Sequence, residues 1–241
     1  MSLPALSFDC IVMPAMSKAI FVALAIPTLL FVRPVLADGE NHLFILSGQS
    51  NMNGLEPTTS FIPTLEQTFR REDIVVVKDS HGGQPIRRWY REWTAGEGQN
   101  AESIGDLYDS LMAKVDSAIA DRSFDSVTFL WMQGEKDARE GNAYRYAKAF
   151  RGVLDQLRKD LERDDINFVI GRLSDFDLKN TRYPHWTKIR EIQVKVAEAH
   201  PRGAWVDTDD LNDGRNRRGT EIKNDLHYSA EGYKTLGKRF A

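Results

Sequence analysis

The sequence predicts an α/β protein of three layers, in which a five-stranded parallel sheet lies between two layers of helices. Short apolar runs alternate with amphipathic segments of helical period along most of the chain. The apolar runs lack the polar–apolar alternation of strands that have one solvent-exposed face. Strands buried on both faces need helices on both sides, joined by right-handed crossovers. No repeat or linker interrupts this alternation, so we expect one domain over residues 38–241.

The predicted strands are five continuous runs of apolar or β-branched residues. Each is short enough for a buried strand and is followed by polar or small residues, as expected where a parallel strand reaches its loop. The runs cover residues 42–46, 74–78, 127–132, 168–172 and 204–207.

The predicted helices carry their apolar side chains on one face, at helical spacing. Their apolar stripes run over residues 104–118, 150–161, 189–199 and 233–240. Ser229 precedes the last stripe and is a suitable N-cap, because its hydroxyl can accept a hydrogen bond from the first turn. Each stripe follows one predicted strand, as the crossovers of a parallel sheet require.

The N-terminal segment differs in composition from the rest of the chain. Residues 19–32 are almost entirely apolar and lead to Ala37, a typical signal-peptidase site. A run of roughly 14 apolar residues is shorter than the ~20 that span a bilayer. Pro27 inside the run also disfavours an uncleaved anchor or a buried helix. We therefore expect a signal peptide over residues 1–37, cleaved after Ala37, and a secreted or periplasmic protein without stable membrane insertion.

Composition excludes several classes of partner and cofactor. The chain has a net charge of −3 and pI near 6.0, which gives no electrostatic basis for binding nucleic acid. Its one cysteine, Cys10, lies in the predicted signal, so no disulfide is expected in the mature chain. There is no His-Glu-x-x-His motif or phosphate-binding glycine loop, and residues 207–214 lack the closing glutamate of a calcium loop. We expect neither a metal nor a cofactor.

The first predicted strand ends in the segment Gly48-Gln49-Ser50-Asn51-Met52. Ligands of open α/β sheets bind at the carboxyl ends of the strands, so Ser50 is placed where a nucleophile would act. The segment is not the Gly-x-Ser-x-Gly elbow of α/β-hydrolases, because position 52 is methionine. Ser50 is therefore the candidate nucleophile, and it needs a base to be activated.

His227 is the favoured base among the five histidines. It follows the last predicted strand, in the loop before the final helix, and so lies at the same sheet edge as Ser50. His81 in the loop after the second strand is the alternative. The remaining three, at positions 42, 185 and 200, occupy element ends where structural roles are expected. Taken alone, His227 is equally compatible with a surface histidine that leads a helix.

Donors for an oxyanion are expected from three strand ends. Gln133 follows the third strand and offers a side-chain amide, Gly83 (or Gly82) in the second loop offers a backbone N–H, and Ser50 offers its own.

Four further residues are candidates for substrate binding or for orienting the site: Asn51, Glu135, Arg87 and Trp89. Glu135 would orient Arg87 or His227, contact a sugar hydroxyl, serve as the catalytic acid, or be a buried structural carboxylate. Arg87 and Trp89 suit a carbohydrate-binding rim, because aromatic faces and guanidinium groups bind sugar rings and carboxylates. Equally, Trp89 would cover the sheet and the arginine would be solvated.

These segments together resemble the conserved blocks of the SGNH hydrolases, in particular carbohydrate esterase family six and the sialate O-acetylesterase-like proteins. The matching blocks are Gly48-Gln49-Ser50-Asn51-Met52, Gly82-Gly83 followed by Ile86 and Trp89, Gln133-Gly134-Glu135, and Asp225-Leu226-His227. The resemblance implies a flavodoxin-like fold and metal-free hydrolysis of O-acetyl esters on carbohydrates.

The last block departs from the family pattern, in which an aspartate stands three residues before the histidine. Position 224 is asparagine, and the carboxylate is Asp225, two residues before His227. We expect Asp225 to be the orienting acid. Alternatively, Asn224 only holds the ring and leaves a Ser–His dyad, or Glu135 supplies the acid.

The sequence thus predicts a serine esterase that removes acetyl groups from acetylxylan, sialic acid or a related glycan through an acetyl-enzyme. An SGNH lipase, a thioesterase and a peptidoglycan O-acetylesterase are alternatives within the hydrolases. A non-catalytic carbohydrate-binding domain with a decayed site is the alternative outside them. Nothing in the sequence predicts the oligomeric state.

Overall fold

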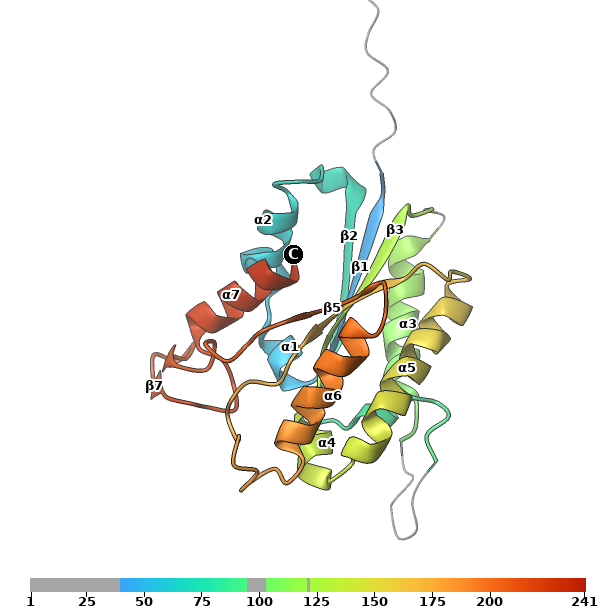
Figure 1. The fold of residues 1–241 in the computed structure, drawn as a ribbon. Helices are drawn as coiled ribbons and strands as arrows, with labels where there is room; N and C mark the ends of the chain where they lie inside the picture. The colour runs from blue at the N-terminus through green and yellow to red at the C-terminus, as the bar shows by residue number, and fades with distance from the viewer. Residues whose placement is uncertain (1–39, 95–102, 121) are drawn as a thin grey trace, which may run out of the picture. The chain divides into compact units, whose positions relative to one another are not determined.

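The computed structural model describes residues 40–94, 103–120 and 122–241. The expected signal peptide over residues 1–37 lies outside the described residues. Five parallel strands form one sheet in the order β2-β1-β3-β4-β5 (Figure 1). This order is the flavodoxin-like one, with the chain reversing direction across the sheet after β2. The strands are β1 (His42–Gly48), β2 (Ile74–Ser80), β3 (Ser126–Met132), β4 (Asn167–Gly171) and β5 (Gly203–Val206).

Helices cover both faces of this sheet, which confirms the predicted three-layer α/β/α class. On one face lie the crossovers α3 (Asp106–Ile119), α5 (Ala143–Asp160) and α6 (Trp186–Glu198). On the other lie α2 (Phe61–Leu65) and the C-terminal α7 (Ala230–Phe240), which contact each other (Figure 1). Short helices follow two strand ends: α1 (Ser50–Gly54) after β1 and α4 (Glu135–Glu140) after β3. Single 3-10 turns are at Pro57–Thr59, Arg71–Asp73 and Ile86–Arg88.

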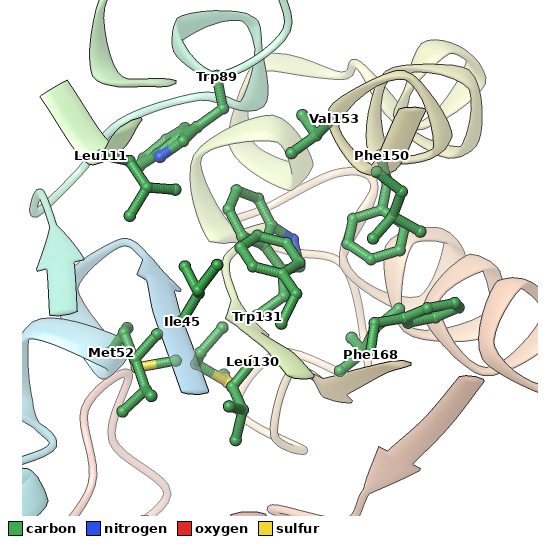
Figure 2. Close-up of a cluster of buried hydrophobic side chains, with 14 of the residues drawn as sticks. Ile45, Met52, Trp89, Leu111, Leu130, Trp131, Phe150, Val153 and Phe168 are labelled. Carbon is green, nitrogen blue, oxygen red and sulfur yellow. The ribbon is translucent and has the colours of Figure 1, made fainter. Parts of the chain in front are cut away.

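The core forms on both faces of the central strands, because successive side chains of a strand point to opposite faces. Trp131 and Leu130 are neighbours on β3, and both are fully buried, one toward each helix layer (Figure 2). The Trp131 ring packs 5.3 Å from that of Trp89, edge to face, and its Nε1 donates to the Tyr146 hydroxyl at 3.1 Å. These contacts explain why the central strands are continuous apolar runs.

All five predicted strands are confirmed to within about two residues, and so is the Ser229 cap, whose hydroxyl accepts from Gly232 N at 3.0 Å. The predicted helical faces are wrong at two ends. Ala118 and Ala199 are exposed, whereas Ile119 of α3 and Val196 and Ala197 of α6 pack against the core at these ends.

The loop after β5 contains a regular element that the sequence analysis did not predict. This element is a small antiparallel hairpin, β6 (Gly214–Arg215) with β7 (Glu221–Ile222). Two-residue strands are too short to produce a periodic pattern in the sequence.

The register of the sheet determines where the candidate site lies. Gly48 at the end of β1 is paired with Ser80 of β2 and with Met132 of β3. The three carboxyl ends therefore stop at the same level, and the segments that follow them, around residues 50, 82 and 135, meet at one edge of the sheet. Among the helices of the described segments, none has the length and apolarity needed to cross a membrane.

Candidate active site

Ser50 is placed by a tight turn at the end of β1. Gly48 has φ +141°, and a Cβ there would lie 2.0 Å from the Met132 carbonyl oxygen of the neighbouring strand, so only glycine fits. The next residue, Gln49, is buried and its N–H donates to that same carbonyl at 2.9 Å. Ser50 then begins α1 and is half-buried. The backbone before the serine is thus fixed by the sheet itself.

A cavity of about 350 Å³ lies beside Ser50. Its lining includes Gly82, Gly83, Glu135 and His227 together with the serine. A Cβ on Gly82 would lie only 3.8 Å from the Ser50 Cβ, so the glycine loop passes directly across from the serine. The structure therefore brings the candidate nucleophile, the favoured base and the glycine pair of the second loop to one cavity.

His227 is held mainly by its backbone. Its N–H donates to Asp225 Oδ1 at 2.9 Å, while its ring Nδ1 lies 3.9 Å from the same oxygen, beyond hydrogen-bond distance. Both side chains are about half exposed, at 49% and 45%. Within the described residues, no hydrogen bond reaches the imidazole. Asp225 is therefore near the ring as an ion-pair partner, without the direct bond of a buried triad.

Asn224, the alternative for holding the ring, faces elsewhere. Its side chain accepts from Asn212 at 3.2 Å and donates to the Phe176 carbonyl at 3.3 Å. It has φ +44°, a left-handed conformation that asparagine tolerates better than most residues. Its contacts fix the loop before His227.

The alternative base, His81, is engaged outside the cavity. Its Nε2 lies 3.1 Å from Asp79 Oδ2, and Asp79 is a buried carboxylate that also accepts from Lys114. His81 does not line the cavity beside Ser50. The geometry favours His227 as the base.

Asn51 connects the two halves of the site without lining the cavity. Its Nδ2 donates to Glu135 Oε1 at 2.9 Å and to the Leu226 carbonyl at 3.1 Å. Its Oδ1 accepts from the Tyr233 hydroxyl at 3.1 Å. All three polar contacts are buried or partly buried, so the Asn51 side chain is engaged by other groups of the protein, which favours an orienting role.

Glu135 is a buried carboxyl at the cavity wall. Its Oε1 accepts from Asn51, and its Oε2 has no partner among the described residues. Burial raises the pKa of Glu135 to about 7, and the nearby Asp137 adds to the rise. Arg87, which Glu135 was considered to orient, pairs instead with Glu140 at 2.8 Å. Because this Oε2 is itself buried, contact of Glu135 with a substrate hydroxyl stays a prediction.

Gln133 lies behind the residues that line the cavity and is not part of the lining. It is fully buried, and its Nε2 is 2.5 Å from Asp137 Oδ2 and 3.0 Å from the Gln84 carbonyl. Asp137 is a fully buried carboxyl that also accepts from Ile86 N at 2.8 Å, and burial raises its pKa to about 6. The Gln133 amide would have to leave these acceptors to reach an oxyanion.

The interpretation of Trp89 as a sugar-binding side chain is wrong. Trp89 is 0% exposed, its Nε1 donates to Ser47 Oγ at 3.0 Å, and its ring packs on Trp131. It covers the sheet, as the alternative interpretation had it. Arg87 is likewise outside the cavity lining, tied to Glu140.

Three lining residues were missed by the sequence analysis: Lys136, Arg139 and Tyr183. The first two share one face of α4 at i,i+3 spacing, which is a usable signal once a helix is expected after Gln133. Tyr183 comes from the irregular segment before α6, and nothing in its sequence context indicated the site. Over the described ranges, no group of three or more His, Cys, Asp or Glu side chains could hold a metal ion.

Comparison with solved structures supports the fold. A protein from Arabidopsis thaliana is similar with a TM-score of 0.62 at 18% identity, over 84% of this chain and 96% of that one. A carbohydrate acetylesterase from Xanthomonas citri has a TM-score of 0.58 at 17% identity, over 83% of this chain and 54% of that one. NanS has a TM-score of 0.57 at 14% identity, over 84% and 95%. At these identities the likeness establishes the flavodoxin-like fold alone. No curated protein matches the sequence.

The family itself is shown by sequence. The profile of the family described as "Carbohydrate esterase, sialic acid-specific acetylesterase" matches residues 53–241, which include the glycine pair, the Gln133 segment and the His227 loop. Ser50 lies just before the matched range, at the start of the helix with which the match begins. The family consists of ester hydrolases, and the cavity beside Ser50 fits that chemistry. The chain therefore belongs to the carbohydrate esterases of the sialic acid-specific acetylesterase family.

Proposed function

We propose that this protein removes O-acetyl groups from a carbohydrate through an acetyl-enzyme, with Ser50 as nucleophile and His227 as general base. The observation that carries the proposal is that these two residues, from opposite ends of the domain sequence, line the same cavity. His227 takes the hydroxyl proton as Ser50 Oγ attacks the acetyl carbonyl. It then gives that proton to the departing sugar oxygen as the ester C–O bond breaks. Water releases acetate by the reverse sequence, with His227 again accepting and returning a proton.

The oxyanion is the charge that this reaction must stabilise. We assign its donors to the backbone N–H groups of Ser50 and Gly83, which both line the cavity. Gln133 was expected as a third donor. Its amide can donate to the oxyanion only after its hydrogen bond to Asp137 is broken. Otherwise its role is to support Gln49, whose Oε1 lies 3.3 Å from the Gln133 Nε2.

The cationic rim favours a carbohydrate that carries a carboxylate. Lys136 and Arg139 both line the cavity; Lys136 lies 3.3 Å from Glu140, whereas Arg139 forms no ion pair within the described segments. Burial raises the pKa of Tyr183 on the same rim, and the charge of Arg139 opposes that rise, which places the two groups near each other. Guanidinium groups bind carboxylates by paired hydrogen bonds. An acidic sugar such as a sialic acid is therefore the substrate we favour.

The nucleophile assignment is tested by Ser50→Ala, with the exposed Ser117→Ala as its control. Turnover of p-nitrophenyl acetate should vanish in the first and persist in the second, with both variants folded. Labelling by a serine-directed phosphonate should disappear with Ser50 as well. Sugar binding by an unmodified protein that is never labelled would instead support a non-catalytic binding domain. A preference for longer acyl chains would indicate a lipase or thioesterase.

The substrate assignment is tested by Arg139→Gln. Its KM for an O-acetylated acidic sugar should rise about tenfold, while p-nitrophenyl acetate, which has no carboxylate, should be unaffected. Lys148→Gln removes an exposed cation outside the cavity and should change neither value. Equal KM values for Arg139→Gln and the unmodified protein would exclude the carboxylate contact.

A further inference from the structure

Three contacts join the helix that carries Ser50 to the C-terminal part of the chain: one to the loop that carries His227, one to α7 and one to the β6–β7 hairpin. The Asn51 amide donates to the Leu226 carbonyl, and the Tyr233 hydroxyl donates to the Asn51 carbonyl oxygen. At the other end of α1, Arg217 of the β6–β7 hairpin donates to the Gly54 carbonyl. The short helix α1 is therefore bonded, near its start and at its end, to residues of the C-terminal part of the chain.

The Tyr233 ring lies between α1 and Arg217. A Cβ on Gly54 would be 2.2 Å from the ring Cζ, so the glycine backbone packs directly on the tyrosine. The Arg217 guanidinium carbon lies 5.0 Å from the ring centroid, within range of a cation–π contact. The ring is 8% exposed. Arg217 and Gly54 thus fix where the Tyr233 hydroxyl can reach.

This hydroxyl sets the orientation of the Asn51 amide. Burial raises the pKa of Tyr233 to about 12, so the phenol keeps its proton and acts as a donor. Asn51 must then present its oxygen to Tyr233 and both N–H groups to the two acceptors, Glu135 and the Leu226 carbonyl. The residue after the nucleophile is in this way bonded to the residue before the base.

We propose that Tyr233 and Arg217 are positioning residues of the esterase: they orient Asn51, which through the Leu226 carbonyl sets the separation of Ser50 and His227. The inference rests on the proposed function, because it concerns the alignment of that nucleophile and base. His227 depends on such support, since its ring has no hydrogen bond among the described residues and its side chain is about half exposed. A displacement of about 1 Å at such a pair is enough to slow a reaction about a hundredfold.

The decisive variant is Tyr233→Phe, which removes one oxygen and keeps the ring. We expect kcat for p-nitrophenyl acetate to fall at least tenfold with KM changed less than twofold, and phosphonate labelling of Ser50 to slow in parallel. The control is Tyr108→Phe, which removes another hydroxyl of a buried tyrosine, bonded to Asp160 at the end of α5 at 3.0 Å. It should lower the melting temperature similarly and leave kcat unchanged. Unchanged kcat in Tyr233→Phe, or an equal fall in both variants, would overturn the proposal.

A second pair of variants tests the route through Asn51. Arg217→Ala should lower kcat about threefold, whereas Arg218→Ala at the next position of the hairpin should not. The kcat of the double variant Arg217→Ala/Tyr233→Phe should lie within twofold of the kcat of Tyr233→Phe, because both changes act on the same Asn51 amide. Fully multiplicative effects would contradict that route. Retained turnover in Ser50→Ala would refute the proposed function itself, whereas its loss together with a fully active Tyr233→Phe would refute only this inference.

Discussion

Ser50 and His227 face one cavity from two supports that are built differently. The serine follows a strand whose last residues are buried, at a glycine that touches the backbone of the neighbouring strand. The histidine stands in a loop, about half exposed, and is held through hydrogen bonds of its own and its neighbour's backbone. The place of the proposed nucleophile is therefore part of the fold, and that of the proposed base is set by local polar contacts. Changes on the serine side should therefore alter mainly the stability of the protein, and changes on the histidine side mainly its reaction rate.

The largest effect is expected from Gly48→Ala. The added Cβ would lie 2.0 Å from the Met132 carbonyl oxygen, and φ +141° is unfavourable for any side chain. Separation of β1 from β3 or a shift of the turn must follow, at a cost of about 4 kcal/mol or more in the free energy of unfolding. Chemical denaturation monitored by tryptophan fluorescence measures this loss.

Gly219→Ala is the matched control for that variant. Gly219 also has positive φ, +81°, but a Cβ there meets nothing within 4 Å. Only backbone strain of about 1 kcal/mol is expected. If the two variants were equally stable, the turn before Ser50 would not be fixed by the sheet, and the contrast between the two sides of the site would fail.

The fold could be predicted because its signals are local. Each central strand is a continuous apolar run, which indicates a strand buried on both faces. Each crossover helix carries an apolar stripe, which indicates a helix buried on one face. The exposed Ala118 and Ala199 show the limit of this prediction, since periodicity does not determine which of the neighbouring residues at a helix end packs against the core.

The candidate site could be predicted only in part. Ser50, Gly83, Glu135 and His227 follow strand ends, and parallel strands end at one edge, so topology alone brings them near each other. Trp89 could not be assigned, because a tryptophan in a polar loop has the same sequence context whether its ring turns inward or outward. Tyr183 was missed because the course of an irregular segment depends on packing that no local pattern encodes.

A smaller effect on the serine side is expected from Glu135→Gln, and it should depend on pH. Burial raises the pKa of Glu135 from 4.5 to about 7, so the folded protein binds this proton more tightly than the unfolded chain. The stabilisation is complete below pH 4.5 and is lost as the pH rises to about 7, by about 3 kcal/mol. Glutamine keeps the acceptor for Asn51 and does not titrate. The variant should therefore gain stability relative to the unmodified protein between pH 5 and pH 7.5.

Asp137→Asn provides the comparison for that measurement. Asp137 is also buried with a raised pKa, about 6, but it lies behind the cavity and bonds Gln133 rather than Asn51. Its pH dependence should have the same sign and occur at lower pH. The stability difference between Glu135→Gln and the unmodified protein should vary from pH 5 to 7.5. A constant difference would show that burial does not raise the pKa of Glu135.

The smallest effect is expected from Asp225→Asn on the histidine side. In a triad with a buried aspartate bonded to the ring, this change lowers kcat by about 10⁴-fold. Here the carboxylate is about half exposed and 3.9 Å from Nδ1, and exposed ion pairs contribute about 1 kcal/mol or less, so kcat should fall no more than about tenfold. Asparagine also keeps the oxygen that accepts the His227 N–H at 2.9 Å. Asp225→Ala removes that acceptor too and should be slower than Asp225→Asn. A 10⁴-fold loss of kcat in Asp225→Asn would mean that the loop moves on substrate binding and completes a triad. His227 would then be held as rigidly as Ser50 during catalysis.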